Sequence, residues 1–321
     1  MLTSIGTPAL WMGFVALVVA LLAIDLGVFH RKDREISARE ALSWTAVWIL
    51  LALAFDGLLW WRAGATTALD FLTAYLVEKS LSIDNLFVFV LVFGTLRIPP
   101  RLQHRVLFWG ILGALVLRGA MILAGTALLT RFGWLVQVFG AFLLVAGARL
   151  LLQRESVPAP LERSVAFRAF RRVVPITHRL DGHRFVTRDL GRWAATPLLL
   201  ALFLVESSDI VFALDSVPAA LGVTLDPFVV FTSNVFAILG LRSLYFAVAR
   251  LLGRFEYLKV GLALVLGFIG AKMLAAPVVH VPPAVSLAIV LALLGGAVVA
   301  SLVRSSRRTR AAAAERSTRT G

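Results

Sequence analysis

Two apolar stretches of the sequence contain carboxylates, which are rare in such surroundings. The first reads EKSLSIDNLFVF from Glu78 to Phe89, and the second reads ESSDIVFALDSVPA from Glu206 to Ala219. A charged side chain at the centre of a bilayer costs about 2.5–3.5 kcal/mol on insertion scales, so acids there require a partner, water or a bound ion. Carboxylate oxygens are ligands that hard divalent cations prefer. The two stretches therefore indicate cation binding within a membrane.

Acids outnumber bases in the apolar stretches. The acids that stand out are Asp25, Asp56, Glu78, Asp84, Glu206, Asp209 and Asp215. The bases in these stretches are Lys79, Arg118, Arg242 and Lys272. If all are ionised, negative charge is left over, and either protons or a bound cation would neutralise it. Alternation between the two is antiport. The alternative is that Asp84, Asp209 and Asp215 form structural ion pairs with the two arginines.

The available ligand types favour a hard cation. The chain has no cysteine, and its five histidines lie in loops or at the ends of apolar stretches. Zinc and copper normally use imidazole or thiolate ligands, whereas Mg²⁺, Ca²⁺ and Mn²⁺ accept carboxylate, amide carbonyl and water oxygens. An oxyanion such as tellurite would be repelled by the acids. Since the three hard cations share the same donors, the residues leave the choice among them open.

The composition excludes a soluble single domain. Of the 321 residues, 60% are hydrophobic and 16% are charged, and the mean hydropathy is +0.89. A bilayer core about 30 Å thick needs about 20 apolar residues per helix. We therefore predict an all-α membrane protein with about nine transmembrane helices, at residues 8–29, 43–61, 68–96, 106–127, 133–152, 195–220, 228–250, 256–275 and 281–303.

Positive charge alternates along the connections between these stretches. Alternate connections place most of the 32 lysines and arginines on one side of the membrane. Because cytoplasmic loops accumulate positive charge, we expect the N-terminus outside and the C-terminus in the cytoplasm. Attraction to anionic lipid then explains the net charge of +14, and no nucleic-acid partner is expected.

One polytopic membrane domain is expected over residues 1–304. The connection at 153–194 is a basic cytoplasmic loop with no domain of its own. The tail at 305–321 is basic and poor in large apolar residues, which predicts a disordered cytoplasmic segment.

The sequence also contains an internal repeat. RFGWLVQVFGAFLLVAGARLL at 131–151 resembles RFEYLKVGLALVLGFIGAKML at 254–274. Upstream of these segments, Leu-Arg-Gly at 117–119 corresponds to Leu-Arg-Ser at 241–243. The landmarks recur in the same order, which predicts two related structural units.

The two units, 68–152 and 195–275, each hold three of the apolar stretches. An odd number of spans inverts the second unit relative to the first, so we expect an inverted repeat. Transporters built in this way bind substrate and coupling ions near the middle of the membrane, often where helices are interrupted.

The acidic pair belongs to this repeat. Glu78 precedes Asp84 by six residues, as Asp209 precedes Asp215. Six residues place two side chains about 240° apart on an unbroken helix, so one regular helix would not direct both inward. Pro218 removes a backbone donor. We therefore expect a local helix break near Asp215.

Three motifs in order resemble the TerC/Alx family of integral membrane proteins, which is named for tellurium resistance. They are the two acidic motifs and TSNVFAILGLRSLYF at 232–246, within a match from Asp25 to Leu274. The resemblance implies a bacterial inner-membrane protein that exports manganese. The metal ligands that it implies are the acids Asp25, Glu78, Asp84, Glu206, Asp209 and Asp215, with the amides of Asn85 and Asn234.

The expected function is a secondary transporter that exports a divalent cation, most simply Mn²⁺, with protons competing for the site. No permanently bound cofactor is expected. An enzyme is not expected, because the sequence has no HExxH or GxSxG motif and no histidine at membrane depth. The alternative is a membrane scaffold in a metal or tellurite stress response, whose loop at 153–194 recruits a cytoplasmic partner. The oligomeric state and the coupling ion stay open.

Overall fold

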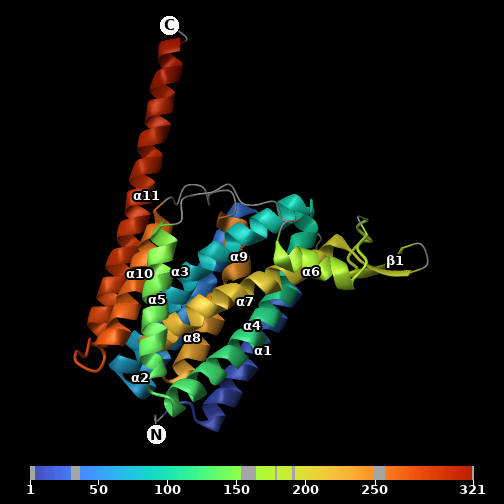
Figure 1. Cartoon of the computed structure of the whole chain (residues 1–321). Helices are drawn as coiled ribbons and strands as arrows, with labels where there is room; N and C mark the ends of the chain where they lie inside the picture. The colour runs from blue at the N-terminus through green and yellow to red at the C-terminus, as the bar shows by residue number, and fades with distance from the viewer. Residues whose placement is uncertain are drawn as a thin grey trace.

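The computed structural model describes residues 4–29, 37–152, 164–177, 179–189, 192–248 and 257–319. The chain folds into a bundle of helices with a small hairpin at its side (Figure 1). The N-terminus and the C-terminus lie at opposite ends of the bundle. The elements follow in the order α1 (Pro8–Phe29), α2 (Ala38–Ala63), α3 (Ala65–Thr95), α4 (Pro100–Arg131), α5 (Leu135–Leu152), α6 (Val165–Val173), β1 (Val186–Asp189), β2 (Arg192–Ala195), α7 (Pro197–Val223), α8 (Pro227–Leu239), α9 (Leu241–Val248), α10 (Leu258–Ala275) and α11 (Pro283–Arg319).

The predicted apolar stretches coincide with helices. Within the described residues, seven helical segments are long and apolar enough to cross a membrane. The helix α1 is apolar but shorter over its searched part, Pro8–Ile24, and α3, which carries the first acidic motif, is not among the seven. The sequence-based expectation of a helical, multi-pass membrane protein is confirmed at this level.

Helix boundaries follow local sequence signals. The N–H of Glu40 donates to the Ser37 hydroxyl at 3.2 Å, which caps α2. Gly64 separates α2 from α3 and has φ of +89°, a conformation that favours glycine. The Asp226 carboxylate accepts the N–H of Phe228 at 2.9 Å and caps α8. These local signals set the first residues of α2, α3 and α8.

The helices of the two predicted repeat units pack against one another. The first unit supplies α3, α4 and α5, and the second supplies α7, the α8–α9 pair and α10. Helix α5 packs along α10, and α3 packs against α7. Helix α4 contacts α7, and α3 contacts α8. The polar residues of α3, α4, α7 and α8 therefore meet between the two units.

Glycines bring α5 and α10 into backbone contact. A Cβ atom at Gly270 would lie 2.6 Å from the carbonyl oxygen of Gly140, and one at Gly147 would lie 2.7 Å from that of Ala263. Both distances are shorter than real Cβ contacts, so these positions require glycine. Position 140 of α5 meets 270 of α10 and position 147 meets 263, so the two helices run antiparallel.

Helix α7 is not interrupted. It runs from Pro197 to Val223 through Pro218, so the break expected near Asp215 is wrong. A proline inside a helix removes one backbone hydrogen bond, but contacts of α7 with α3 and α4 hold the remaining turns in place. Figure 1 shows α7 lying obliquely across the bundle.

An interruption separates α8 from α9 instead, at Gly240. The Lys79 ammonium donates to the carbonyl oxygen of Ala237 in the last turn of α8, at 3.1 Å. The C-terminal end of a helix carries partial negative charge, which a cation compensates. Lys79 of the first unit therefore stabilises the interrupted helix of the second.

The predicted loop at 153–194 contains secondary structure where it is described. Helix α6 is capped by the Ser164 hydroxyl, which accepts the N–H of Phe167 at 3.1 Å. Strand β1 pairs with β2 in antiparallel register, with Val186 opposite Ala195. The hairpin departs from an all-α fold, because valine, threonine and tryptophan favour strands. Residues 153–163 lie outside the described part of the chain.

The C-terminal segment, for which a disordered tail at 305–321 was expected, is helical as far as Arg319. Helix α11 continues through Arg319, and Figure 1 shows it extending beyond the other helices. Alanines at 311–314, flanked by arginine and glutamate, have high helix propensity and explain the continuation.

Candidate cation site

The side chain of Arg118 is the centre of a buried polar cluster. Only 2% of Arg118 is exposed. Its Nη1 donates to Glu78 Oε1, while Nη2 donates to Asp209 Oδ1 at 2.8 Å and Nε donates to Asp209 Oδ2 at 3.2 Å. A guanidinium stays protonated in proteins, and its planar fork matches a carboxylate. The cluster therefore has one fixed positive charge held between two acids.

Neutral side chains complete the cluster. Arg118 Nη1 also donates to Ser216 Oγ at 3.0 Å and to Asn234 Oδ1 at 3.3 Å. Asn85 Nδ2 donates to Asp209 Oδ1 at 3.1 Å. We call this set the Arg118 cluster; its members, from α3, α4, α7 and α8, are Glu78, Asn85, Arg118, Asp209, Ser216 and Asn234.

The Arg118 cluster can accept more positive charge. Glu78 and Asp209 are 1% and 7% exposed and share one guanidinium, so one negative charge is left over when both are ionised. Two buried oxygens, Glu78 Oε2 and Asn85 Oδ1, accept no hydrogen bond within the described structure. Buried polar atoms without a partner are rare in proteins. Both oxygens are therefore candidate ligands for a proton, a water molecule or a cation.

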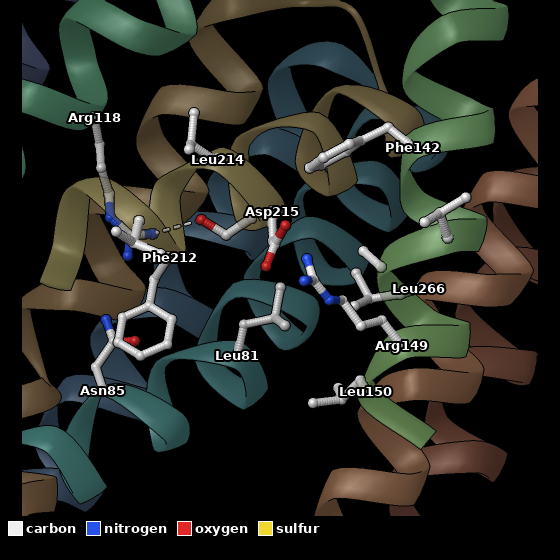
Figure 2. A pocket seen from close by; sticks show the side chains of 14 residues that line it. Leu81, Asn85, Arg118, Phe142, Arg149, Leu150, Phe212, Leu214, Asp215 and Leu266 are labelled. Atoms are coloured by element: carbon white, nitrogen blue, oxygen red, sulfur yellow. Dashed lines mark hydrogen bonds between the residues drawn. The ribbon is translucent and has the colours of Figure 1, made fainter. Parts of the chain in front are cut away.

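A cavity of about 450 Å³ lies beside the Arg118 cluster, which supplies Asn85, Arg118 and Ser216 to its wall. Figure 2 shows that the side chains of Asp215 and Arg149 point toward one another in the same cavity. Most of the remaining wall is apolar and comes from α3, α5, α7 and α10. We call this space the α5–α7 cavity. At about 30 Å³ per water molecule, the cavity has room for a hydrated ion.

Four of the eight predicted ligands meet in the Arg118 cluster, namely Glu78, Asn85, Asp209 and Asn234. Asp215 lies apart from them in the α5–α7 cavity. Since α7 is unbroken, Asp215 and Asp209 are about 240° apart around its axis, and each faces a different arginine. The two side chains therefore point in different directions, as expected for an unbroken helix, and the predicted helix break is not needed.

The other predicted ligands lie elsewhere or outside the described part. The Glu206 carboxylate packs against α4, where a Cβ atom at Gly113 would overlap it. The side chains of Asp25 and Asp84 lie outside the described structure.

The six predicted ligands whose side chains are described do not all lie in one group. Among the described side chains, no three aspartates, glutamates or histidines are arranged to hold a metal ion. For Asp209 the structure has the arginine pairing that the sequence left as the alternative. The Arg118 guanidinium lies between the two acids.

Sequence reasoning did not assign Arg118, Ser216 or Arg149 to the site. Arg118 was recognisable as a base within an apolar stretch, but its partners depend on tertiary packing. Arg149 lies so near the end of its stretch that it counts as a loop residue. Asp70 was also missed, although it lies inside the predicted stretch 68–96.

Comparison with known proteins identifies the family. Residues 63–309 match the family described as integral membrane protein TerC. The chain belongs to the TerC family. It is 56% identical to an uncharacterized membrane protein of Myxococcus xanthus, over 94% of each chain. The family expected from the three motifs is thus confirmed, and with it an integral, multi-pass membrane protein.

Other relatives carry a provisional description. This TerC family protein is 45% identical to Alx of Salmonella typhi, provisionally described as a membrane-bound redox modulator, over 91% of this chain and 94% of the relative. It is 36% identical to an uncharacterized membrane protein of Rickettsia felis, over 92% of this chain and 98% of the relative. No solved structure matches the chain significantly.

Proposed function

We propose that this TerC family protein is a secondary transporter that exports a divalent cation, Mn²⁺, across the bacterial inner membrane. The observation that carries the proposal is the Arg118 cluster, in which two buried carboxylates share one guanidinium. The leftover negative charge and the unpartnered oxygens Glu78 Oε2 and Asn85 Oδ1 favour a cation. Arg118 neutralises the acids when the cation is absent, and the cation competes with it.

The donor chemistry supports the choice of cation. The cluster offers carboxylate, amide and hydroxyl oxygens, and the chain has no cysteine. Mn²⁺ accepts such oxygens, whereas zinc and copper sites normally include imidazole or thiolate. Protons bind the same carboxylates, so proton binding and cation binding exclude one another. This exclusion provides a route to coupling, with protons as the counter-ion.

The proposal includes nine spans in an inverted repeat, with the N-terminus outside. The α5–α10 contacts support the repeat. In the repeat, position 140 corresponds to 263 and position 147 corresponds to 270. Exchanging the units therefore converts the contact of Gly140 with Gly270 into that of Ala263 with Gly147, and both contacts are present. The paired contacts of α4 with α7 and of α3 with α8 have the same symmetry. The position of the termini at opposite ends supports an odd number of spans.

The description of the Alx relatives as redox modulators fits an indirect effect. The 321 residues contain no cysteine, so thiol–disulfide chemistry cannot occur on these side chains. A change in the manganese content of the cell would alter redox balance without any redox step in the membrane protein. We therefore place redox modulation downstream of ion transport.

Uptake of Mn²⁺ into everted membrane vesicles tests the proposal, since export from a cell becomes uptake in that orientation. We expect uptake by the parent and severe loss in Asp209→Asn and Asp215→Asn. Asp56→Asn is the matched control, because Asp56 is an acid of α2 outside the Arg118 cluster and the α5–α7 cavity. Ca²⁺ and Mg²⁺ added as competitors measure the preference.

Two outcomes would contradict the proposal. Equal Mn²⁺ uptake by the parent and both site variants would show that these acids are not needed for transport. Absence of uptake by the parent, together with a cellular role that survives both substitutions and fails when the α6–β2 segment is deleted, would favour the membrane scaffold.

A further inference from the structure

Two bases occupy equivalent positions in the repeat, Arg149 in α5 and Lys272 in α10. Each follows an Arg-Phe pair by the same number of residues, and each is preceded by Gly-Ala. Helices α5 and α10 pack along one another in antiparallel directions. Equivalent residues on antiparallel helices lie at opposite ends of the pair. From the contact of position 147 with 263, the two bases are about 17 Å apart along the helix axes, at 1.5 Å per residue.

Arg149 faces an acid of the other repeat unit. It lines the α5–α7 cavity with Asp215 of α7, and Figure 2 shows the two side chains directed toward one another with Leu81 beside them. Figure 2 draws no hydrogen bond between them. The opposite charges thus face one another in the cavity beside the Arg118 cluster, so an ion pair formed between them would narrow the cavity there.

Lys272 also interacts with an acid of the other repeat unit. Lys272 and Asp70 of α3 attract one another electrostatically, and Thr224, just after α7, lies next to the Asp70 carboxylate. Helix α10 contacts both α3 and α7. This group therefore joins three helices of both units, at the end of the α5–α10 pair opposite to Arg149.

The geometry points to matched gates: Arg149 with Asp215 closes one end of the ion path, and Lys272 with Asp70 closes the other. The inference rests on the proposed transport function and adds the residues that control access. By the predicted orientation, the Arg149 gate faces the cytoplasm and the Lys272 gate faces outside. Each gate joins the last helix of one unit to the first helix of the other, so rocking of the units tightens one pair while loosening the other.

Thiol labelling tests the gates without requiring transport. Because the natural chain has no cysteine, a single introduced cysteine is the only reactive thiol. Leu81→Cys reports on the α5–α7 cavity, and Val223→Cys reports on the Asp70–Lys272 end. A membrane-impermeant maleimide is added to everted vesicles or to intact cells, and the labelling rate is measured for each cysteine in the parent and gate variants.

We expect Arg149→Gln to raise labelling of Leu81→Cys from the cytoplasmic face several-fold, and Arg149→Lys to leave it near the parent rate. We expect Lys272→Gln to raise labelling of Val223→Cys from the outer face several-fold. The exchange Asp70→Lys with Lys272→Asp should restore the low rate, because it keeps the pair of opposite charges. Labelling is compared per amount of membrane-inserted protein.

Unchanged labelling in both glutamine variants would overturn the gates, as would failure of the charge exchange to restore a rate that Lys272→Gln had raised. The result also separates this inference from the proposed function. If the labelling pattern is observed while the parent moves no Mn²⁺, the gates stand and the proposed cargo is wrong. If the parent moves Mn²⁺ and labelling does not respond, only the gates are wrong.

Discussion

Arg118 of α4 holds Asp209 of α7 by two hydrogen bonds, from Nη2 at 2.8 Å and from Nε at 3.2 Å. The same guanidinium binds Glu78 of α3, so it joins helices of both repeat units. Removing one partner of a buried pair leaves an uncompensated charge, which costs more than the pair contributes. Arg118 is therefore expected to control stability as well as access to the acids.

The first prediction concerns the guanidinium itself. Arg118→Gln leaves Glu78 and Asp209 buried without their cation, so we expect a loss of about 3–5 kcal/mol in the free energy of unfolding. Arg118→Lys keeps the charge but cannot form the two-pronged pair, and should lose less. Denaturant unfolding in detergent measures both. Arg101→Gln, at an exposed position of α4, is the control; equal effects of the two glutamine variants would contradict the account.

The second prediction separates stability from ion binding. Glu78→Gln removes the leftover negative charge while Asp209 still pairs with Arg118, so unfolding stability should stay near that of the parent. Mn²⁺ binding should nevertheless weaken strongly, because one carboxylate ligand is lost. Thermal unfolding with and without Mn²⁺ measures both properties, since a ligand of the folded state raises the unfolding temperature. Parent-like stabilisation by Mn²⁺ in this variant would exclude Glu78 as a ligand.

The third prediction tests the close approach of α5 and α10. Gly270→Ala places a Cβ atom 2.6 Å from the Gly140 carbonyl oxygen, so we expect a loss of about 1–3 kcal/mol in unfolding stability. Gly267→Ala is the matched control on the same helix, because a Cβ atom there meets nothing within 4 Å. Its higher helix propensity should leave stability unchanged or raise it by up to about 1 kcal/mol. A larger loss of unfolding stability in Gly267→Ala than in Gly270→Ala would rule out this close packing of α5 and α10.

The helices could be derived from the sequence, and so could the meeting of Glu78 with Asp209, whereas the role of these residues as ligands stays a prediction. Hydropathy located the helices because an apolar segment that crosses lipid must satisfy its own backbone hydrogen bonds, as a helix does. The repeat indicated that the motifs around Glu78 and Asp209 converge, since equivalent helices of inverted units meet near the middle. The base that lies between these acids could not be derived, because the sequence shows only that Arg118 is within an apolar stretch and not which side chains it contacts.

The helix break shows a second limit of sequence reasoning. Pro218 predicts a break from local chemistry, but α7 is continuous through it and packs against α3 and α4. The actual interruption lies at Gly240, close to the Ala237 carbonyl oxygen that accepts a hydrogen bond from Lys79 of another helix. Asp215 also shows how the direction of a side chain depends on helix continuity: on an unbroken α7 it faces Arg149 instead of Arg118.

The fourth prediction concerns the interrupted helix. Lys79→Met removes the hydrogen bond to the Ala237 carbonyl oxygen and the positive charge at the end of α8. We therefore expect the free energy of unfolding to fall by about 0.3–2 kcal/mol. Hydrogen exchange of the backbone amides around Gly240 should accelerate, because this end of α8 opens locally more often. Lys79→Arg, which keeps the charge, should retain more protection than Lys79→Met. Identical exchange in the parent and Lys79→Met would show that the ammonium does not stabilise the interruption.

The most direct measurement is equilibrium binding of Mn²⁺ to the purified protein, followed by the loss of the electron paramagnetic resonance signal of the free ion. We expect that the parent and Asp56→Asn bind Mn²⁺, that acidification releases it, and that Glu78→Gln and Asp209→Asn bind it far more weakly. Binding of equal strength in the parent and in both cluster variants would contradict the assignment of the Arg118 cluster as the cation site.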